Sequence, residues 1–580
     1  QTTEIPFEVD VELAMGPDMT FKYPISDDID VLATQIRDAV PSPDGSQLAF
    51  TVLNKLYVQD LPDGTPRRVT NDDHTEAQPA WSPDGKFLTY VTWDQQEGGH
   101  IYKVEPNARR IRPQKLTEEA AFYITPAWSY NSDRIVFAKG NKFDFMNTSS
   151  ANAYYFATDE LGWISTDGGD VNFIARTNGR TSPHFIKSDD RIYLTNNEGV
   201  LVSIRWDGSD EKEHVKITGI SVYGTRDPVS ASEAGIILKA PEGDQVLAQI
   251  NNEVYIATVP QTGSVVNIGL ASPDNAVFPA KKLTLIGGEF PKWSNDGNQV
   301  HWSLGKGHFV YNLDDAQAFA DSVEAAKKAE EEAAEADEEA DNEETGEDVE
   351  DSVEEDESTE DEEKEEGPTE YKPEEIRIEV VFERDIPEGT VLLQNARVIT
   401  MNGYEVFDRG DVLVVNNRIE GVGTAGTLDV PSDAEVIDLT GKTIVPGFVD
   451  THAHLRSTRG IHKDQEWSYA VNLAYGVTTT RDPQTGTTDV LSYGDAVIAG
   501  NMIGPRIYST GPGVGFWGYK LKSLDHTKEV LRQYSEYFDT KTIKMYRVGN
   551  RKQRQWVIMA SKEQELMPTT EGSLHMRRSE

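Results

Sequence analysis

Two histidines one residue apart, His452 and His454, are the side chains of this sequence whose type and spacing best suit metal chemistry. They follow an apolar run, Thr443 to Val449, whose β-branched residues predict a strand buried on both faces. Since side chains alternate along a strand, Asp450, His452 and His454 are expected to share one face. Neutral imidazole binds zinc and similar divalent metals. The pattern therefore predicts a metal site at the carboxyl end of the strand, with two solvent-facing histidines as the alternative.

The residues around these histidines resemble a known family. Pro446-Gly447-Phe448-Val449-Asp450-Thr451-His452-Ala453-His454 resembles the first barrel strand of the amidohydrolase superfamily, in which this motif supplies two metal ligands. The resemblance implies a (β/α)8 barrel whose second, third and fourth strands would be residues 476–482, 504–509 and 542–546. It also implies one or two divalent metal ions, with zinc as the expected metal.

Lys544 is the residue to which the resemblance gives both a metal-binding and a catalytic role. In many amidohydrolases with two metals, a fourth-strand lysine is carboxylated and bridges the ions, and Lys544 stands at that place. Carboxylation would turn a cation that is hard to bury into an anionic oxygen ligand. The expected metal ligands are therefore His452, His454 and Lys544, and the alternative for Lys544 is a structural barrel lysine.

The expected barrel is shorter than a complete one. From the aspartate of the motif to the last residue there are 131 residues, whereas a complete barrel takes about 250. The family places further histidines on strands five and six and an aspartate on strand eight, and Glu571 or His575 could supply a fifth-strand ligand. We therefore expect residues 448–580 to be the first half of a barrel in a longer protein. His462 and His526 lie between expected strands and are predicted to be surface histidines.

The N-terminal part of the chain is built from a repeat, and such self-similarity indicates the fold directly. The motif Pro-x-Trp-Ser-Pro-Asp-Gly, clearest at residues 79–85, has five related copies. Each copy predicts a hairpin, because proline presets φ and glycine accepts a positive φ in the turn. The copies predict a six-bladed β-propeller over residues 1–385, with a β-sandwich as the rival fold. The repeat resembles TolB-type propellers, and we expect Trp81, Trp128 and Trp293 in its core.

An acidic tract interrupts this pattern. Residues 321–370 hold 27 Asp or Glu and three Lys, in a chain whose net charge is −44. Because the tract can bury little apolar area, residues 318–372 are predicted to be a disordered insertion in the last blade, with a helix over 316–340 as a partial alternative. Residues 386–447 alternate in short strands, and they resemble the N-terminal part of the small β-sandwich that flanks amidohydrolase barrels, to which both ends of the chain contribute in that family.

Composition excludes several classes of function. The chain has no cysteine, so it has no disulfide, thiolate metal site or cysteine nucleophile. Its acidity argues against nucleic acid or anionic lipid as a partner. No apolar run reaches the roughly 18 residues that span a bilayer. The first residue, Gln1, is typical of a processed N-terminus, so we expect a periplasmic or secreted protein.

These features predict a multidomain chain: an all-β six-bladed propeller, a small β-sandwich and an incomplete (β/α)8 amidohydrolase barrel. The resemblance, closest to imidazolonepropionase- and prolidase-like enzymes, implies hydrolysis of an amide-type C–N bond in a dipeptide or cyclic amide by metal-activated water. It also allows a protein partner on the propeller and a homo-oligomer. The competing hypothesis is a non-enzymatic periplasmic binding or scaffold protein whose partial barrel is inert.

Overall fold

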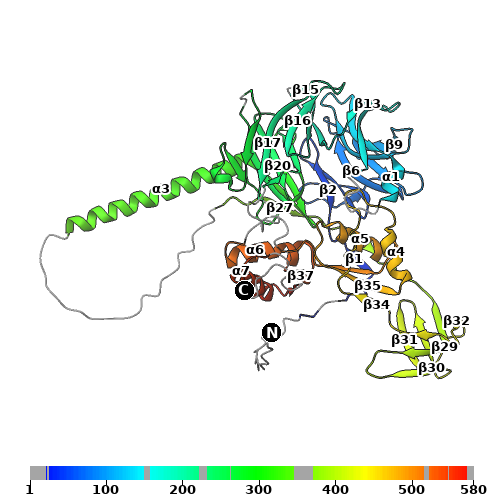
Figure 1. Cartoon of the computed structure of the whole chain (residues 1–580). Helices are drawn as coiled ribbons and strands as arrows, with labels where there is room; N and C mark the ends of the chain where they lie inside the picture. The colour runs from blue at the N-terminus through cyan, green and yellow to red at the C-terminus, as the bar shows by residue number, and fades with distance from the viewer. Residues whose placement is uncertain are drawn as a thin grey trace, which may run out of the picture.

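The computed structural model describes residues 21–22, 25–148, 157–187, 189–220, 231–260, 263–344, 370–514, 521–545 and 548–570. Figure 1 shows a β-rich N-terminal region in blue to green, a mixed α/β region in orange to red beneath it, and a separate β lobe in yellow. None of the helices in these ranges is long and apolar enough to cross a membrane.

The described part of the N-terminal region contains six sheets that follow one another along the chain. The first three are β2 (Arg37–Pro41), β3 (Gln47–Val52), β4 (Lys55–Asp60) and β5 (Arg67–Arg68); β6 (Thr75–Trp81), β7 (Leu88–Trp93), β8 (Ile101–Val104) and β9 (Gln114–Lys115); and β10 (Phe122–Trp128), β11 (Arg134–Gly140), β12 (Thr158–Ser165) and β13 (Asn172–Arg176). A short helix, α1 (Lys142–Asn147), follows β11.

The other three sheets continue the pattern. They are β14 (Thr181–Ile186), β15 (Asp189–Thr195), β16 (Val200–Ile204), β17 (Lys212–Gly219) and β18 (Ser232–Glu233), with β22 (Val266–Gly269) parallel to β17; β19 (Ile236–Lys239), β20 (Gln245–Ile250), β21 (Glu253–Thr258) and β23 (Ala280–Lys282); and β24 (Glu289–Trp293), β25 (Gln299–Leu304), β26 (Gly307–Asn312) and β27 (Glu374–Arg377). A short 3-10 helix, Pro273–Asn275, precedes β23. All pairings other than β17 with β22 are antiparallel, as the predicted hairpins require.

The six sheets form a ring. Strands β2, β6, β10, β14 and β19 contact one another in this order, and β24 of the last sheet contacts both β20 and β2. A two-stranded sheet of β1 (Asp30–Leu32) and β28 (Val381–Glu383) joins the beginning of the region to its end. The first strands of the sheets therefore surround a common axis.

The tryptophan of the repeated motif ties neighbouring sheets together. Trp81 Nε1 donates a hydrogen bond to the carbonyl oxygen of Val40 in the preceding sheet, at 3.2 Å. Trp128 and Trp293 make the same bond to their preceding sheets, at 3.1 and 3.0 Å. Trp81 and Trp128 are each 7% exposed, which confirms their expected place in the core, whereas Trp293 is only partly buried. In these three copies of the repeat, the tryptophan thus supplies both apolar packing and a bond between sheets.

The acidic tract begins as a helix. Helix α3 (Leu313–Glu344) extends away from the body in Figure 1. The prediction of disorder from residue 318 is therefore wrong as far as residue 344, because alanine, glutamate and lysine have high helix propensity. Residues 345–369 lie outside the described residues. Strands β26 and β27, on either side of the tract, pair in register from Gly307 with Arg377 to Val310 with Glu374, so the tract interrupts the last sheet as expected.

The yellow lobe is one sheet. It consists of β29 (Thr390–Ile399), β30 (Val406–Val415), β31 (Arg418–Thr424), β32 (Glu435–Asp438) and β33 (Thr443–Ile444), with β29 at its centre. The predicted sandwich would need a second sheet, and the described residues supply none. Ile419 and Val436 accordingly remain 68% and 55% exposed. A tight hairpin through Asn416 and Asn417 joins β30 and β31, with Val415 paired to Arg418.

The C-terminal region alternates strands and helices. Its elements are β34 (Phe448–Asp450), α4 (Trp467–Ala474), β35 (Val477–Asp482), α5 (Asp489–Ile498), β36 (Arg506–Ser509), α6 (Leu524–Arg532), a π-helical turn (Gln533–Tyr537), β37 (Thr542–Lys544), α7 (Arg551–Glu563) and β38 (Met567–Thr569). Strands β34, β35 and β36 form one parallel sheet, and β37 and β38 form another. This order is that of repeated βα units.

One apolar core joins the C-terminal region to the ring of sheets. Val254 and Trp302 of the ring belong to the same buried cluster as Val490, Val530 and Tyr534 of the C-terminal helices. Backbone and side-chain hydrogen bonds cross the same boundary; for example, Tyr537 Oη donates to Glu375 at 2.9 Å. The position of the ring over the C-terminal strands is thus fixed by packing.

Candidate functional site

His452 and His454 lie side by side just after β34. The strand ends at Asp450, whose carboxylate accepts the backbone N–H of His452 at 2.9 Å. The two imidazole rings are 5.1 Å apart and inclined at 75°. Both histidines are exposed. The structure therefore brings together the two side chains that the motif singles out, in the turn after the strand rather than in the strand.

The strand before them is not buried as predicted. Phe448 and Val449 are 59% and 60% exposed, so the prediction of burial on both faces is wrong. Among the described strands, β34 pairs only with β35, and this makes it an edge strand. A parallel strand of a barrel would be covered by a neighbour on each side.

Asp482, at the carboxyl end of β35, is a neighbour that the sequence analysis missed. Its Oδ1 lies 3.9 Å from Nδ1 of His454, and its Oδ2 accepts the backbone N–H of Leu455 at 3.3 Å. Burial raises the pKa of Asp482 to about 7. A strand-end carboxylate beside a strand-end histidine could have been found from the parallel register alone, because β34 and β35 end at the same edge.

Lys544 ends β37 and is 2% exposed. Its carbonyl oxygen accepts the N–H of Val514 at 2.9 Å, which links the segment after β36 to β37. Arg481 of β35 connects the two parallel sheets, since its guanidinium donates to the hydroxyls of Thr542 and Thr569 at 3.2 and 2.8 Å. Arg481 thus links the sheet of Lys544 to the sheet that ends at the histidine turn, and the metal-binding role of Lys544 stays a prediction.

The side chains of His452, His454 and Asp482 are of the types that bind a divalent metal, but too few of them lie close together to form a complete site. Two imidazoles and a nearby carboxylate are typical ligands, and zinc sites use three or four protein ligands. Within the described residues, however, no three His, Cys, Asp or Glu side chains are close enough to hold one ion. Glu571 and His575, which could add a ligand, lie outside the described residues.

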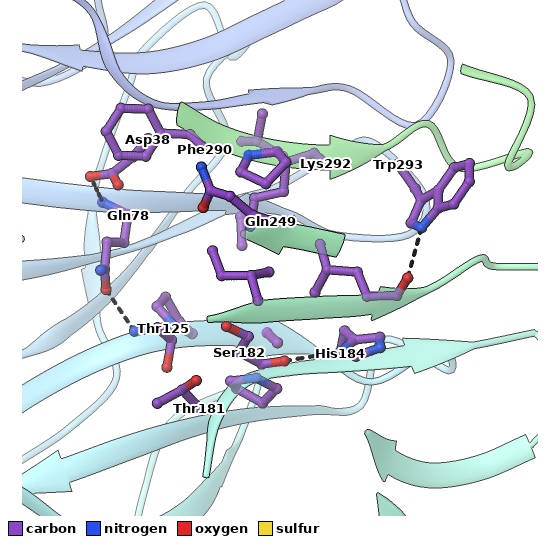
Figure 2. Close-up of a pocket in the computed structure, with 18 of the residues that line it drawn as sticks. Asp38, Gln78, Thr125, Thr181, Ser182, His184, Gln249, Phe290, Lys292 and Trp293 are labelled. Carbon is purple, nitrogen blue, oxygen red and sulfur yellow. Dashed lines mark hydrogen bonds between the residues drawn. The ribbon is translucent and has the colours of Figure 1, made fainter. Parts of the chain in front are cut away.

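A second candidate site is the cavity along the axis of the ring, with a volume of about 700 Å³. Its wall consists of residues from the first strands of the sheets, including Asp38, Gln78, Ser182 and Lys292 (Figure 2). One end is bordered by the turns of the repeats. The other end is closed by residues of the loops after β34 and β35: Arg459, Gly460, Gly486 and Thr487, and Asp489 at the start of α5. The cavity therefore runs from the turns to the loops that follow the histidine strand and its neighbour.

The wall of this cavity carries the same backbone irregularity in five sheets. Asp38, Gln78, Thr125, Ser182 and Phe290 all have φ between 51° and 57°, and the strand register shifts at each of them. Such φ values are costly for threonine and phenylalanine. Hydrogen bonds link the irregular positions of the first three sheets, because the side chains of Asp38 and Gln78 each accept a backbone N–H from the next sheet. The Gln78 N–H donates to Asp38 at 3.2 Å, and the Thr125 N–H donates to the Gln78 side chain at 2.6 Å.

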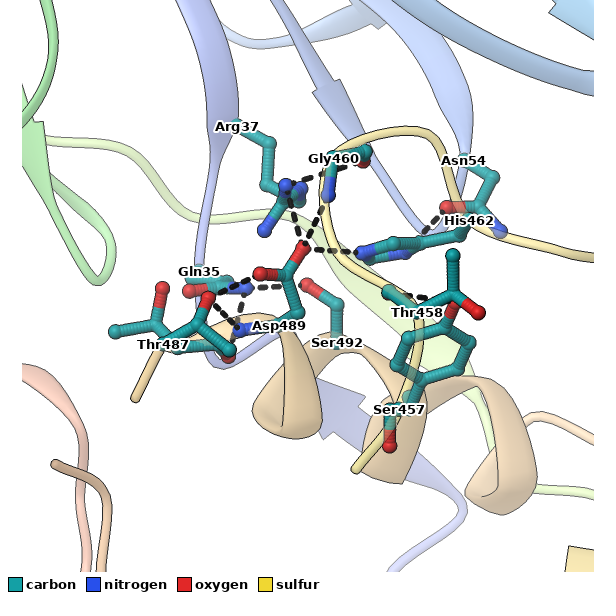
Figure 3. Close-up of polar contacts among 12 residues, drawn as sticks. Gln35, Arg37, Asn54, Ser457, Thr458, Gly460, His462, Thr487, Asp489 and Ser492 are labelled. Carbon is teal, nitrogen blue, oxygen red and sulfur yellow. Dashed lines mark hydrogen bonds and ion pairs between the residues drawn. The ribbon is translucent and has the colours of Figure 1, made fainter. Parts of the chain in front are cut away.

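At the closed end, Asp489 joins the ring to the C-terminal region (Figure 3). Its Oδ1 lies 2.7 Å from Nη2 of Arg37 and 2.9 Å from Nε2 of His462, and it accepts the N–H of Gly460 at 3.2 Å. Burial opposes the charge of Asp489, but Arg37 and His462 outweigh it and hold its pKa well below the usual range.

His462 is not the surface residue that the sequence predicted. It is 2% exposed, and its Nδ1 is 2.9 Å from Oδ1 of Asn54 in the ring. Burial and the nearby Arg37 lower its pKa. The prediction is wrong because the loop after β34 packs against the ring, a contact that only the tertiary structure reveals. His526, in contrast, is partly exposed on α6.

Comparison with protein families and curated proteins finds similarity to two kinds of protein. Residues 38–206 match the TolB beta propeller domain. A dihydroorotase of Listeria monocytogenes serotype 4a (strain HCC23) is 38% identical over 73 residues, which are 13% of this chain and 16% of that protein. A dihydroorotase of Bacillus thuringiensis (strain Al Hakam) is 39% identical over 89 residues, 15% of this chain and 20% of that protein. The matched segments span a fifth or less of these relatives.

Solved structures resemble the chain in parts. A putative TolB from Agrobacterium tumefaciens covers 48% of this chain and 89% of its own, with 17% identity and a TM-score of 0.33. A putative prolidase from Bifidobacterium longum covers 32% of this chain and 50% of its own, with 20% identity and a TM-score of 0.27. The chain thus contains a TolB beta propeller domain at residues 38–206 and is similar over 73 to 89 residues to dihydroorotases, which are amidohydrolases.

Proposed function

We propose that this protein is a metal-dependent amidohydrolase that cleaves an amide-type C–N bond in a small substrate, with a dipeptide or a cyclic amide as the candidate classes. One observation carries the proposal. The motif that resembles the first amidohydrolase strand ends in two histidines whose rings lie side by side, at the same sheet edge as the buried carboxylate of Asp482. The local similarity to dihydroorotases supports it.

In this proposal, His452 and His454 hold part of the metal site and Lys544, as its carbamate, supplies a further ligand. A divalent ion bound there would act as a Lewis acid and activate water. Asp482 lies beside His454 and is a candidate to orient its ring, as carboxylates commonly do for metal-binding histidines. We further propose that additional chain completes the ligand set, because the described residues do not contain a third ligand of the usual types.

The domain organisation belongs to the same proposal. The six sheets would be the six blades of a propeller over residues 1–385, residues 386–447 would be part of a flanking β domain, and residues 448–580 would be the first half of a (β/α)8 barrel. The propeller would then cover the face that carries the loops after β34 and β35, where barrel enzymes have their active sites. A periplasmic location is part of the proposal, as is a small amide substrate.

The test is hydrolysis by the natural-length protein. Dipeptides, among them X-Pro dipeptides, and the cyclic amide dihydroorotate would be incubated with the purified zinc-supplemented protein and followed by NMR. We expect hydrolysis of at least one class, and its loss after treatment with a chelator and in the variant His454→Ala. Hydrolysis that persists at full rate in His454→Ala would refute the site, and absence of hydrolysis across both classes would refute the proposed bond type.

A further inference from the structure

The axial cavity contains two cations that the rest of the described protein does not pair. Lys292 of β24 and Arg459 of the loop after β34 both line it. Neither side chain takes part in a hydrogen bond or ion pair within the described residues, and Nε of Arg459 is buried without a partner. Asp38 attracts Lys292 electrostatically but makes no ion pair with it.

The other cations of the cavity wall differ in this respect. Arg37 is paired with Asp489 at 2.7 Å, Lys187 is paired with Glu242 at 2.7 Å, and Arg180 is paired with Glu211. Lys239 has no ion pair but donates a hydrogen bond to the carbonyl oxygen of Gly243 at 3.1 Å. The side chain of Lys292 is exposed to the cavity, whereas Nε of Arg459 is buried, and a buried charge without a partner is costly. Lys292 and Arg459 therefore differ from the other cations of the wall, whose side chains each have a hydrogen-bond or ion-pair partner.

Two neutral polar side chains of the cavity wall, those of Asn252 and Thr125, also have polar atoms without a hydrogen-bond partner. Asn252 is 4% exposed, and neither its amide oxygen nor its amide nitrogen has a hydrogen-bond partner among the described residues. The hydroxyl of Thr125, which also faces this cavity (Figure 2), is buried and lacks a partner as well. Buried polar groups in native proteins are nearly always satisfied, so such a group needs an explanation. A ligand in the cavity supplies one.

The positions of the two cations indicate the shape of that ligand. Arg459 lies at the end of the cavity closed by the C-terminal loops. On β24, Glu289 marks the same end, because it accepts the hydroxyl of Thr488 at 2.8 Å. Lys292 lies three residues further along the strand, which is at most about 10 Å toward the turns, because the register shift at Phe290 shortens this stretch. The two cations are therefore separated along the axis, and an elongated ligand could reach both.

We infer that the cavity is a binding site for an elongated small molecule with two carboxylates, one contacting Lys292 and the other Arg459, and with an amide or hydroxyl group near Asn252. A compact anion such as phosphate reaches only one cation at a time and binds less tightly. This inference does not rest on the proposed hydrolysis, because it concerns equilibrium binding in the ring of sheets.

The test is isothermal titration calorimetry of the chain with four probes: glutarate, N-acetylglutamate, inorganic phosphate and the uncharged glutaramide. We expect glutarate to bind, N-acetylglutamate to bind more tightly, and phosphate to bind at least tenfold more weakly than glutarate. Glutaramide is expected not to bind. Equal binding of phosphate and glutarate would overturn the two-point dicarboxylate site, and failure of both dicarboxylates to bind would overturn the inference altogether.

Variants locate the site. Lys292→Met and Arg459→Met should each weaken glutarate about tenfold, the effect of losing one charge-assisted contact, whereas Lys292→Arg should retain most of the affinity. Asn252→Leu should weaken N-acetylglutamate and leave glutarate unchanged, which a loss of folding would not do. Lys328→Met, on exposed α3, is the matched control. Binding that is unchanged in both Met variants would place the anion elsewhere and refute the inference.

Discussion

Removal of the Asp489 carboxylate should destabilise the joint between the ring and the C-terminal region more than any surface change. Asp489 faces Arg37 and His462, and these three residues are 3%, 7% and 2% exposed. Loss of one partner of a buried charge pair typically costs about 3–5 kcal/mol, because the remaining charge stays buried and unpaired. We expect Asp489→Ala to lower the free energy of unfolding by that amount.

The assay is urea denaturation followed in parallel by tryptophan fluorescence and far-UV circular dichroism. Both signals should shift together, because the ring and the C-terminal helices share one apolar core. The double variant Arg37→Met with Asp489→Leu removes both charges and should cost less than Asp489→Ala alone. Glu332→Ala breaks an exposed pair with Lys328 on α3 and should cost at most about 0.5 kcal/mol.

The stability that the Asp489 carboxylate contributes should depend on pH. The pKa of Asp489 is lowered in the folded protein, so its contribution is present at neutral pH and disappears as the pH falls below the ordinary aspartate value of 3.8. The difference between wild type and Asp489→Ala should therefore shrink in strong acid. A cost below about 1 kcal/mol for Asp489→Ala at pH 7 would refute the assignment of Asp489 as the charge that holds the joint.

Three further predictions concern the rest of the fold. Burial raises the pKa of Asp495 to about 7, whereas the ordinary aspartate value is 3.8. Between these two pH values the folded protein keeps a proton that the unfolded chain has lost, so the free energy of unfolding should fall as the pH rises from 3.8 to 7. Asp495→Asn should make this decrease smaller in urea titrations. Deletion of residues 321–366 should change the melting temperature little, because β26 and β27 pair on either side of the tract; a loss of many degrees in a thermal scan would show that the tract packs. Trp128→Phe should cost about 1–3 kcal/mol, because the carbonyl of Ala80 loses its inter-sheet bond; an unchanged urea midpoint would show that the bond contributes nothing.

The repeats were predictable because their signal is local. A turn with proline and glycine, followed by alternating apolar and polar residues, gives the same hairpin wherever it occurs. Where the repeat has a tryptophan, its indole N–H bonds to the preceding sheet. The insertion point of the acidic tract followed from the strands around it, and β26 and β27 confirm it. The sequence predicts too short a helix in the tract, because the high charge of the tract indicates disorder. Its alanines and lysines have high helix propensity, and α3 continues to Glu344.

The tertiary contacts of the candidate sites were less accessible from the sequence. His462 was placed on the surface because nothing nearby in the sequence indicates that Asn54, more than four hundred positions away, would contact it. Asp482 was overlooked because only the pairing of β34 with β35 brings it to His454. The sequence likewise does not indicate that Lys292 and Arg459 line one cavity, because only the packing of the C-terminal loops against the ring brings the two residues together.

The metal content of the natural-length protein and of its ligand variants tests the proposed function most directly. Elemental analysis after extensive dialysis should give one or two zinc equivalents for the wild type, and a strongly reduced content for His452→Ala with His454→Ala, because loss of ligands leaves an open, weakly held site. Lys544→Arg should also lower the content, since arginine keeps the charge but cannot form a carbamate. Wild-type metal content in the double histidine variant would contradict the proposed site.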